Sequence, residues 1–266
     1  MEVVIMDKVY HYTKNQNVDS IIKNDAIRLL STFFRKYDKE DYLWIKNCSK
    51  DVIKEICIEN KWTYDEEELT LKPYFISFCQ DQNSSYMWKH YADEGKGVKL
   101  VFNKELLKAC DHLNPNGNGG HHLAIEATLP CIYIEDKSSL KQQLLDNINI
   151  EDLQPWDYFD RLRFLASAIK QARLYKEERE YRHIHLYPIV FAAEYNEGNF
   201  YFMDNEGPGE GNDMRITVLF PKEMLVGIEL GSNTTQKEFC QMRNYMMSIG
   251  YSPDIVTRMS SKVKSK

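Results

Sequence analysis

Short segments of apolar residues, alternating or continuous, recur along the chain and predict β-strands. The expected strands are Val3–Thr13, Ile27–Leu30, Tyr74–Cys79, Gly97–Phe102, Leu129–Ile134, Glu180–Val190, Phe200–Met203, Arg215–Leu219 and Leu225–Leu230, with an edge segment near Asp254–Val256. Apolar residues at intervals of three or four predict helices between these strands. The expected helices are Asn17–Asn24, Lys50–Asn60, Ser84–Asp93, Lys104–Asp111, Leu140–Ile148, Asp157–Leu174 and Thr235–Ile249. This order predicts an α+β fold in which helices are inserted between strands of a mixed, mainly antiparallel sheet.

No internal repeat or linker divides the sequence, so we expect a single α+β domain over residues 1–266. Residues 31–72 are polar and aromatic, and predict a mainly helical insertion that decorates the core. Further helices are expected over about 139–174. Asn114–Gly120 has the composition of a flexible loop. Residues 258–266 form a short basic tail that we expect to be solvated.

Composition and charge narrow the class of protein. The chain has 266 residues, of which 43% are hydrophobic and 28% charged, as in a globular protein with a sizeable core. A formal net charge of −6 argues against general electrostatic binding of nucleic acid, although it leaves room for a local basic groove. The sequence shows no leader-like N-terminus and no apolar stretch of about 18 residues. We therefore expect a cytoplasmic protein that does not bind a membrane.

The six cysteines lie far apart and form no CxxC pair, which fits neither a zinc site nor a disulfide scaffold. Several have apolar neighbours, which predicts buried free thiols. His112, His121 and His122 surround the glycine-rich loop. These histidines could suggest a metal, but imidazoles in such a loop are usually exposed, and we expect no metal site.

A histidine and a threonine on the first strand are candidates for ligand binding. Because side chains alternate along a strand, His11 and Thr13 should share one face and Tyr10 and Tyr12 the other. An imidazole with a hydroxyl two residues away can hydrogen-bond a sugar hydroxyl. The alternative is a histidine whose ring is satisfied by a backbone carbonyl.

A second group of candidates follows the strand that carries Ser77. The next helix brings Tyr86, Trp88 and Tyr91 near the end of this strand. Trp88 and Tyr91 are three residues apart and should be neighbours on one helical face. Their rings could sandwich a flat heterocycle, or they could be ordinary core side chains.

The third group is an alternating run of acidic and basic residues. If residues 178–182 are extended, Glu178, Glu180 and Arg182 share one face. Two carboxylates so close raise one another's pKa while the guanidinium lowers it, which makes a tunable acid/base or cation-stabilising pair. If residues 174–182 are helical instead, Glu178 and Arg182 form an ordinary surface pair.

Together these residues resemble the bacterial Domain of Unknown Function 2971 family over about residues 9–256. The resemblance rests on Tyr10-His11-Tyr12-Thr13, Ile76-Ser77-Phe78, Met87-Trp88-x-x-Tyr91-Ala92, Gly97-Val98, Lys170, Tyr175-x-x-Glu178-x-Glu180-x-Arg182 and Val226-x-Ile228-x-Leu230-Gly231. The Met-Trp-x-x-Tyr-Ala and Glu-x-Glu-x-Arg blocks are its most specific parts. The chain departs from the family pattern after Leu30, where Lys36–Glu40 matches only loosely.

More distantly, the order of these motifs is similar to that of the ADP-ribosyltransferase superfamily, whose members cleave NAD. This resemblance implies an ADP-ribosyltransferase-like split sheet and a set of roles at the matching positions. His11 and Thr13 would bind the adenosine ribose, Ser77 would support the nicotinamide ribose, and Tyr91 or Tyr86 would stack on nicotinamide. Glu180 would be the catalytic acid and Glu178 would orient the acceptor, with Arg182 also among the NAD-binding residues.

The leading hypothesis is therefore an NAD-dependent ADP-ribosyltransferase or NAD glycohydrolase with an unknown acceptor, and superfamily analogy implies a toxin or a phage-defence effector. NAD would be the substrate, and no metal would be needed. One alternative is a non-enzymatic module of the same fold that binds a nucleotide or a protein. Another is a nucleic-acid-modifying enzyme, which the acidic net charge disfavours.

Overall fold

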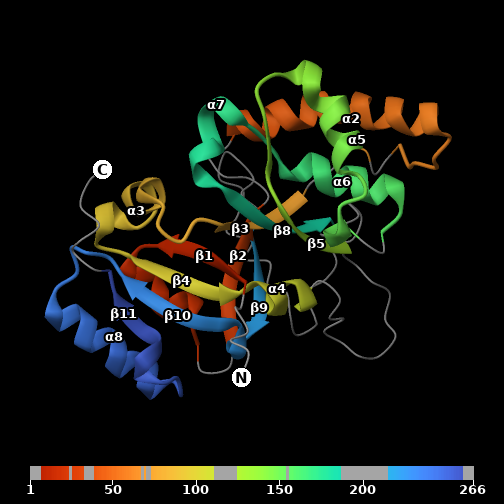
Figure 1. Cartoon of the computed structure of the whole chain (residues 1–266). Helices are drawn as coiled ribbons and strands as arrows, with labels where there is room; N and C mark the ends of the chain where they lie inside the picture. The colour runs from red at the N-terminus through yellow and green to blue at the C-terminus, as the bar shows by residue number, and fades with distance from the viewer. Residues whose placement is uncertain are drawn as a thin grey trace, which may run out of the picture. The chain divides into compact units, whose positions relative to one another are not determined.

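A computed structural model describes most of the chain (Figure 1). The residues described are 7–23, 26–32, 39–66, 69, 73–110, 125–153, 156–186 and 215–259. The predicted strand Phe200–Met203, the loop at 114–120 and the start of the first predicted strand lie outside these residues.

The chain divides into two compact units. Unit 1 contains Met1–Leu29, Phe78–Cys110 and Leu219–Lys266, and unit 2 contains Leu30–Ser77 and Asp111–Val218. Three strands contribute residues to both units: β2 (Ala26–Thr32), β3 (Pro73–Cys79) and β9 (Arg215–Pro221).

Unit 1 is organised around hydrogen-bonded strands that are mostly antiparallel. β4 (Val98–Asn103) pairs antiparallel with β1 (Lys8–Thr13) and with β10 (Leu225–Leu230), while β11 (Val256–Arg258) pairs parallel with β10. The helices of this unit are α1 (Val18–Ile21), α3 (Ser85–His90), α4 (Lys104–Cys110) and α8 (Gln236–Ser248). The short 3₁₀ turns are η1 (Asn15–Asn17), η2 (Asp93–Gly95), η6 (Lys222–Met224) and η7 (Pro253–Ile255).

Local side-chain chemistry explains where two of these helices begin. The Ser84 hydroxyl accepts a hydrogen bond from the Met87 backbone N–H, so it satisfies a donor at the start of α3. α8 starts with a capping box, in which Thr235 and Glu238 satisfy one another's backbone N–H groups. Figure 1 shows α8 beside β11 at the edge of this unit.

Unit 2 contains a second set of strands. β8 (Glu180–Leu186) pairs antiparallel with β5 (Ile125–Pro130), and it also pairs with β3. β6 (Ile132–Ile134) and β7 (Ile169–Gln171) form a separate parallel pair. The helices and 3₁₀ turns of this unit are α2 (Lys39–Asn60), η3 (Lys137–Ser139), α5 (Leu140–Asn147), η4 (Glu151–Leu153), α6 (Tyr158–Ala168), α7 (Ala172–Tyr175) and η5 (Lys176–Glu178).

The core of unit 2 includes a helix that we expected outside it. Ile53, Ile56 and Cys57 of α2 recur at helical spacing and are buried in the cluster that also contains Leu162 and Leu165 of α6. The expectation that residues 31–72 only decorate the core is therefore wrong for α2. Its apolar stripe is part of the core.

Two predicted elements are divided in the structure. The segment 129–134 contains parts of two strands, because β5 ends at Pro130 and β6, which pairs with β7 instead of β8, begins at Ile132. The predicted helix 157–174 ends at Ala168, and Ile169–Gln171 is extended and pairs with β6. The predicted α+β class and the mainly antiparallel strand pairing are confirmed. Among the described helices, none combines the length and apolar character needed to cross a membrane.

Candidate functional site

Two carboxylates and two cations come together in the interior of unit 2. Glu180 is the first residue of β8, and Arg182 follows two residues later on the same face of the strand. Lys170 comes from β7 and Glu178 from the end of η5. All four residues are buried, with exposed fractions of 2–5%. We call this group the ion network.

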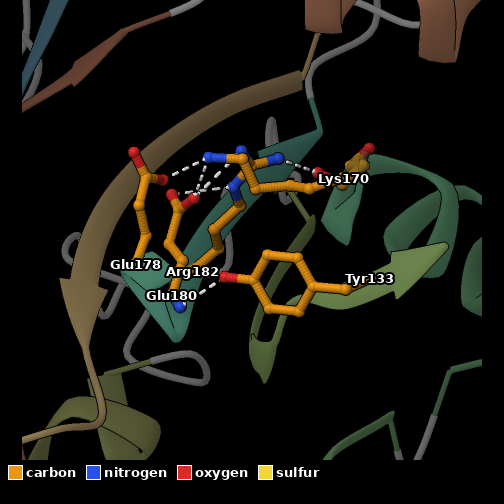
Figure 2. A network of polar contacts seen from close by, with 6 residues as sticks. Tyr133, Lys170, Glu178, Glu180 and Arg182 are labelled. Carbon is orange, nitrogen blue, oxygen red and sulfur yellow. Dashed lines mark hydrogen bonds and ion pairs between the residues drawn. The ribbon is translucent and has the colours of Figure 1, made fainter. Parts of the chain in front are cut away.

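The contacts within the ion network are short and reciprocal (Figure 2). The Lys170 Nζ lies 2.6 Å from Glu178 Oε2 and 2.6 Å from Glu180 Oε2. The Arg182 guanidinium donates to both carboxylate oxygens of Glu180, from Nε to Oε1 at 2.9 Å and from Nη2 to Oε2 at 3.3 Å. Lys170 therefore bridges the two glutamates, and Glu180 lies between the two cations.

Neighbouring residues fix both the backbone and the side chains of the ion network. The backbone N–H of Glu180 donates to the Tyr133 hydroxyl at 2.7 Å, and its carbonyl accepts from the Cys131 N–H at 2.9 Å. Arg182 Nη1 donates to the Ser167 carbonyl at 2.6 Å. That carbonyl is at the C-terminal end of α6, where the helix leaves acceptors without intrahelical partners and favours a cation. The Arg182 guanidinium also lies 4.0 Å from the centre of the Phe75 ring.

The charges of the ion network determine its protonation. Burial alone would raise the pKa of Glu180, but Arg182 and Lys170 outweigh burial and hold the pKa of this carboxyl well below its usual range. Burial alone would lower the pKa of Lys170, but Glu180 and Glu178 outweigh it and raise this pKa. Glu180 is thus a carboxylate and Lys170 an ammonium at neutral pH.

This protonation state limits the chemistry that Glu180 can perform. An ionised carboxylate cannot donate a proton, so the geometry does not suit Glu180 to general-acid chemistry. An ionised carboxylate can stabilise a positive charge that develops close by, and here Arg182 and Lys170 already engage both of its oxygens. Burial raises the pKa of the adjacent Cys131 thiol and of the Tyr133 hydroxyl, so both stay neutral.

The extended interpretation of the acidic run is confirmed from Glu180 onward. Residues 180–186 form β8, so the helical pairing of Glu178 with Arg182 is wrong. Glu178 lies in η5 rather than in the strand, and Arg179 between them adopts a left-handed conformation (φ 43°, ψ 51°). The turn nevertheless brings Glu178 to the same lysine as Glu180.

Unit 1 holds the candidates on the first strand. His11 and Thr13 lie in β1 opposite Leu100 and Val98 of β4. Thr13 is buried and its hydroxyl accepts from Asn17 Nδ2 at 3.0 Å. His11 is half-buried, with its ring edge-on to Phe78 at 6.2 Å between ring centroids.

Unit 1 also holds the aromatic candidates of α3. Trp88 is buried and meets the Tyr12 ring edge-on at 5.2 Å between centroids. Tyr91 is half-buried and packs against the cluster that contains Trp88, which is itself a core residue. Tyr86 is half-buried and its ring centroid lies 4.4 Å from that of His90.

The predicted site residues thus fall into both units. His11, Thr13, Tyr86 and Tyr91 belong to unit 1, whereas Ser77, Glu178, Glu180 and Arg182 belong to unit 2. Ser77 is a half-buried residue of β3. Within unit 2 the structure joins Glu178, Glu180 and Arg182 in one network.

Three polar residues received no functional role from the sequence, although Lys170 is part of the pattern that resembles the DUF2971 family. Lys170 and Tyr133 complete the ion network. In unit 1, Lys99 is 1% exposed, donates to the Gln82 carbonyl at 2.8 Å, pairs with Glu229 and lies 5.3 Å from the Tyr10 ring. The sequence does contain an indication of both lysines, because each is a single cation in a mainly apolar segment. Lys170 lies in Ala168–Ala172 and Lys99 in Val98–Phe102.

The part of the chain that the structure describes contains no group of three or more His, Cys, Asp or Glu side chains that could hold a metal ion. His112, His121 and His122 lie outside the described residues. Among the described cysteines, Cys57, Cys79 and Cys131 are buried free thiols and Cys240 is an exposed one.

Comparison with known families identifies one match. Residues 87–183 match the family model described as Protein of unknown function (DUF2971). This match supports the expected resemblance to the DUF2971 family over the segment that carries Trp88, Tyr91 and the whole ion network. It begins after Tyr86 and does not include His11, Thr13 or Ser77. The comparisons with curated proteins and with solved structures gave no match.

Proposed function

We propose that the protein consumes NAD, as an ADP-ribosyltransferase or an NAD glycohydrolase, with Glu180 as the residue that stabilises the transition state. The observation that carries this proposal is the buried, ionised Glu180 at the start of β8, paired with Glu178 through Lys170. The two glutamates of the Glu-x-Glu motif thus pair with the same lysine, Lys170. By superfamily analogy such an activity would serve a bacterial toxin or a phage-defence effector.

The chemistry requires a carboxylate rather than an acid. When the bond between nicotinamide and ribose breaks, the bonding electrons leave with the nicotinamide nitrogen and the ribose becomes oxocarbenium-like. A carboxylate hydrogen-bonded to the ribose 2′-hydroxyl stabilises that positive charge. Water or an acceptor nucleophile then attacks the ribose carbon. By the superfamily resemblance alone, His11 and Thr13 match positions that hold the adenosine ribose, Ser77 one that supports the nicotinamide ribose, and Tyr91 or Tyr86 one that stacks on nicotinamide.

A specific observation favours a second candidate, a non-enzymatic module that binds a nucleotide or a protein. Glu180 is 3% exposed, and its carboxylate is engaged by Arg182 and Lys170. A buried network of this kind can specify packing without any catalytic role.

One experiment distinguishes the two candidates. The protein is incubated with NAD, and nicotinamide release is measured for wild type, Glu180→Gln and Glu177→Gln. We expect Glu180→Gln to lower turnover on the order of 10²–10³-fold. Glu177 is an exposed neighbour in η5, and its substitution should leave turnover unchanged.

Circular dichroism and direct NAD binding show whether Glu180→Gln keeps its fold and its ligand. Near-normal NAD consumption by a folded Glu180→Gln protein would disprove the assignment. Binding of NAD by wild type without nicotinamide release would establish the binding module instead.

A further inference from the structure

The connection between β7 and β8 contacts the ion network at two points. This connection, residues 172–179, consists of α7, η5 and Arg179. The Tyr175 ring centroid lies 4.3 Å from the Lys170 ammonium, and Glu178 Oε2 lies 2.6 Å from the same nitrogen. Lys170 thereby contacts both the connection, through Tyr175 and Glu178, and Glu180.

We infer that residues 172–179 form a cover that closes over Glu180 and is held shut by the ion pair between Glu178 and Lys170. The inference rests on the proposed function, because a substrate must reach a carboxylate that is 3% exposed here. The structure then represents the closed, resting form, and opening of the cover precedes any contact of Glu180 with a ligand.

Few side chains of the cover are buried. Ala172 and Glu178 are buried and Tyr175 is half-buried, whereas the other side chains of the connection are exposed: Arg173, Leu174, Lys176, Glu177 and Arg179. Leu174 is 48% exposed, which is high for a leucine. A segment with so little buried apolar surface opens at a lower free energy than the core beneath it. The ion pair between Glu178 and Lys170 is one contact that opposes this opening.

The joint between the cover and β8 is strained. Arg179 has φ 43° and ψ 51°, a left-handed conformation that is unfavourable for a residue with a Cβ. The Glu178–Lys170 pair favours the closed form, and Arg179 marks the junction with β8 at which the segment would move.

Limited trypsin digestion tests the cover, because Arg173, Lys176 and Arg179 are exposed cleavage positions in it. Cleavage at each position is followed over time by mass spectrometry for wild type, Glu178→Gln and the matched control Glu177→Gln. We expect Glu178→Gln to speed cleavage within 172–179 on the order of tenfold or more, because local opening becomes more frequent. Glu177→Gln should digest like wild type. Tyr175→Ala, which removes the ring over Lys170 but no charge, should speed cleavage by a smaller factor.

A second cleavage position separates local opening from unfolding of the unit. Arg163 lies in the middle of α6 and is 4% exposed, so trypsin reaches it only when the core opens. The inference requires cleavage in the cover to rise without a matching rise at Arg163. Equal rates for Glu178→Gln and wild type, or a parallel rise at Arg163, would overturn it. The digestion contains no NAD, so the cover and the proposed function can fail independently.

Discussion

The Lys170 ammonium lies 2.6 Å from a carboxylate oxygen of Glu180, and each of these residues comes from a different strand of unit 2. Glu178 adds a second negative charge to Lys170, and Arg182 adds a second positive charge to Glu180. The four formal charges cancel. A buried group of charges is tolerated only when it is balanced in this way, so each member depends on the others.

Removal of Lys170 should be strongly destabilising. Lys170→Met leaves two buried carboxylates with one guanidinium, and we expect the free energy of unfolding to fall by about 3–5 kcal/mol. The double variant Lys170→Met/Glu178→Gln restores a neutral pair of Glu180 and Arg182. It should recover part of the loss, with a coupling energy of about 1–3 kcal/mol. Chemical denaturation of the wild type, both single variants and the double variant measures this cycle.

The surface of unit 2 supplies a matched control for this cycle. Lys141 of α5 also bridges two glutamates, Glu55 and Glu59 of α2, at 2.8 and 2.7 Å. The three side chains are 32–55% exposed, so water and salt screen their attraction. Lys141→Met should therefore have only a small effect on stability. An effect of Lys170→Met as small as that of Lys141→Met would contradict the importance of burial.

The stability of the protein should depend on pH through Glu180. The pKa of Glu180 is lowered in the folded protein by Arg182 and Lys170, which outweigh burial, from an ordinary value of 4.5. Below about pH 4.5 the unfolded chain binds a proton that the folded chain does not, so this contribution is present above pH 4.5 and is lost as the pH falls. Lys170 has a raised pKa, so its contribution is lost only at alkaline pH, above its ordinary value of 10.5.

Denaturation at a series of pH values checks this dependence. Exposed carboxyls with lowered pKa values, such as Glu66 and Glu238, also make the free energy of unfolding depend on pH in the acid range. The difference between wild type and Glu180→Gln isolates the contribution of Glu180. We expect the slope of unfolding free energy against pH to be shallower in Glu180→Gln below pH 4.5. Parallel slopes would mean that folding does not lower the pKa of Glu180.

The sequence could predict much of the ion network because β8 obeys the period of two. Glu180 and Arg182 are two residues apart, and alternation alone places them on one face. Lys170 could not be placed, because the helical spacing of apolar residues continues from Phe159 through Ile169 and predicts a helix there. Pairing of Ile169–Gln171 with β6 overrides that local preference and turns Lys170 toward the glutamates.

Other contacts have no local signature at all. The Tyr133 hydroxyl accepts from the backbone of Glu180, which is 47 positions away in the chain. No spacing rule indicates such a contact. The same holds for Tyr12, whose hydroxyl donates to the carbonyls of Asp81 and Gln82 at 3.1 and 3.0 Å. Strand and helix positions follow from periodicity, whereas the partners of single polar groups follow from tertiary packing.

Gly97 should be intolerant of a side chain. A Cβ at this position would lie 2.3 Å from the Thr13 carbonyl oxygen and 2.8 Å from that of Ala92, and both are backbone atoms that cannot turn away. We expect Gly97→Ala to lower the free energy of unfolding by about 1–3 kcal/mol or more. Gly227→Ala is the matched control, because its nearest contact would be the Val101 side chain at 3.4 Å. Equal melting temperatures for the two variants would show that the backbones of Thr13 and Gly97 are not in close contact.

The half-buried ring of Tyr91 tests the aromatic part of the proposed NAD site. If it stacks on nicotinamide, Tyr91→Leu should raise the KM for NAD by about tenfold or more, because stacking of a base on an aromatic ring is worth about 1–3 kcal/mol. Tyr91→Phe keeps the ring and should behave like wild type. Tyr86 is also half-buried but packs against His90, so Tyr86→Leu should raise KM less. Steady-state nicotinamide release, with melting temperatures to verify folding, separates these variants. A KM that is the same in Tyr91→Leu and Tyr91→Phe would remove Tyr91 from the site.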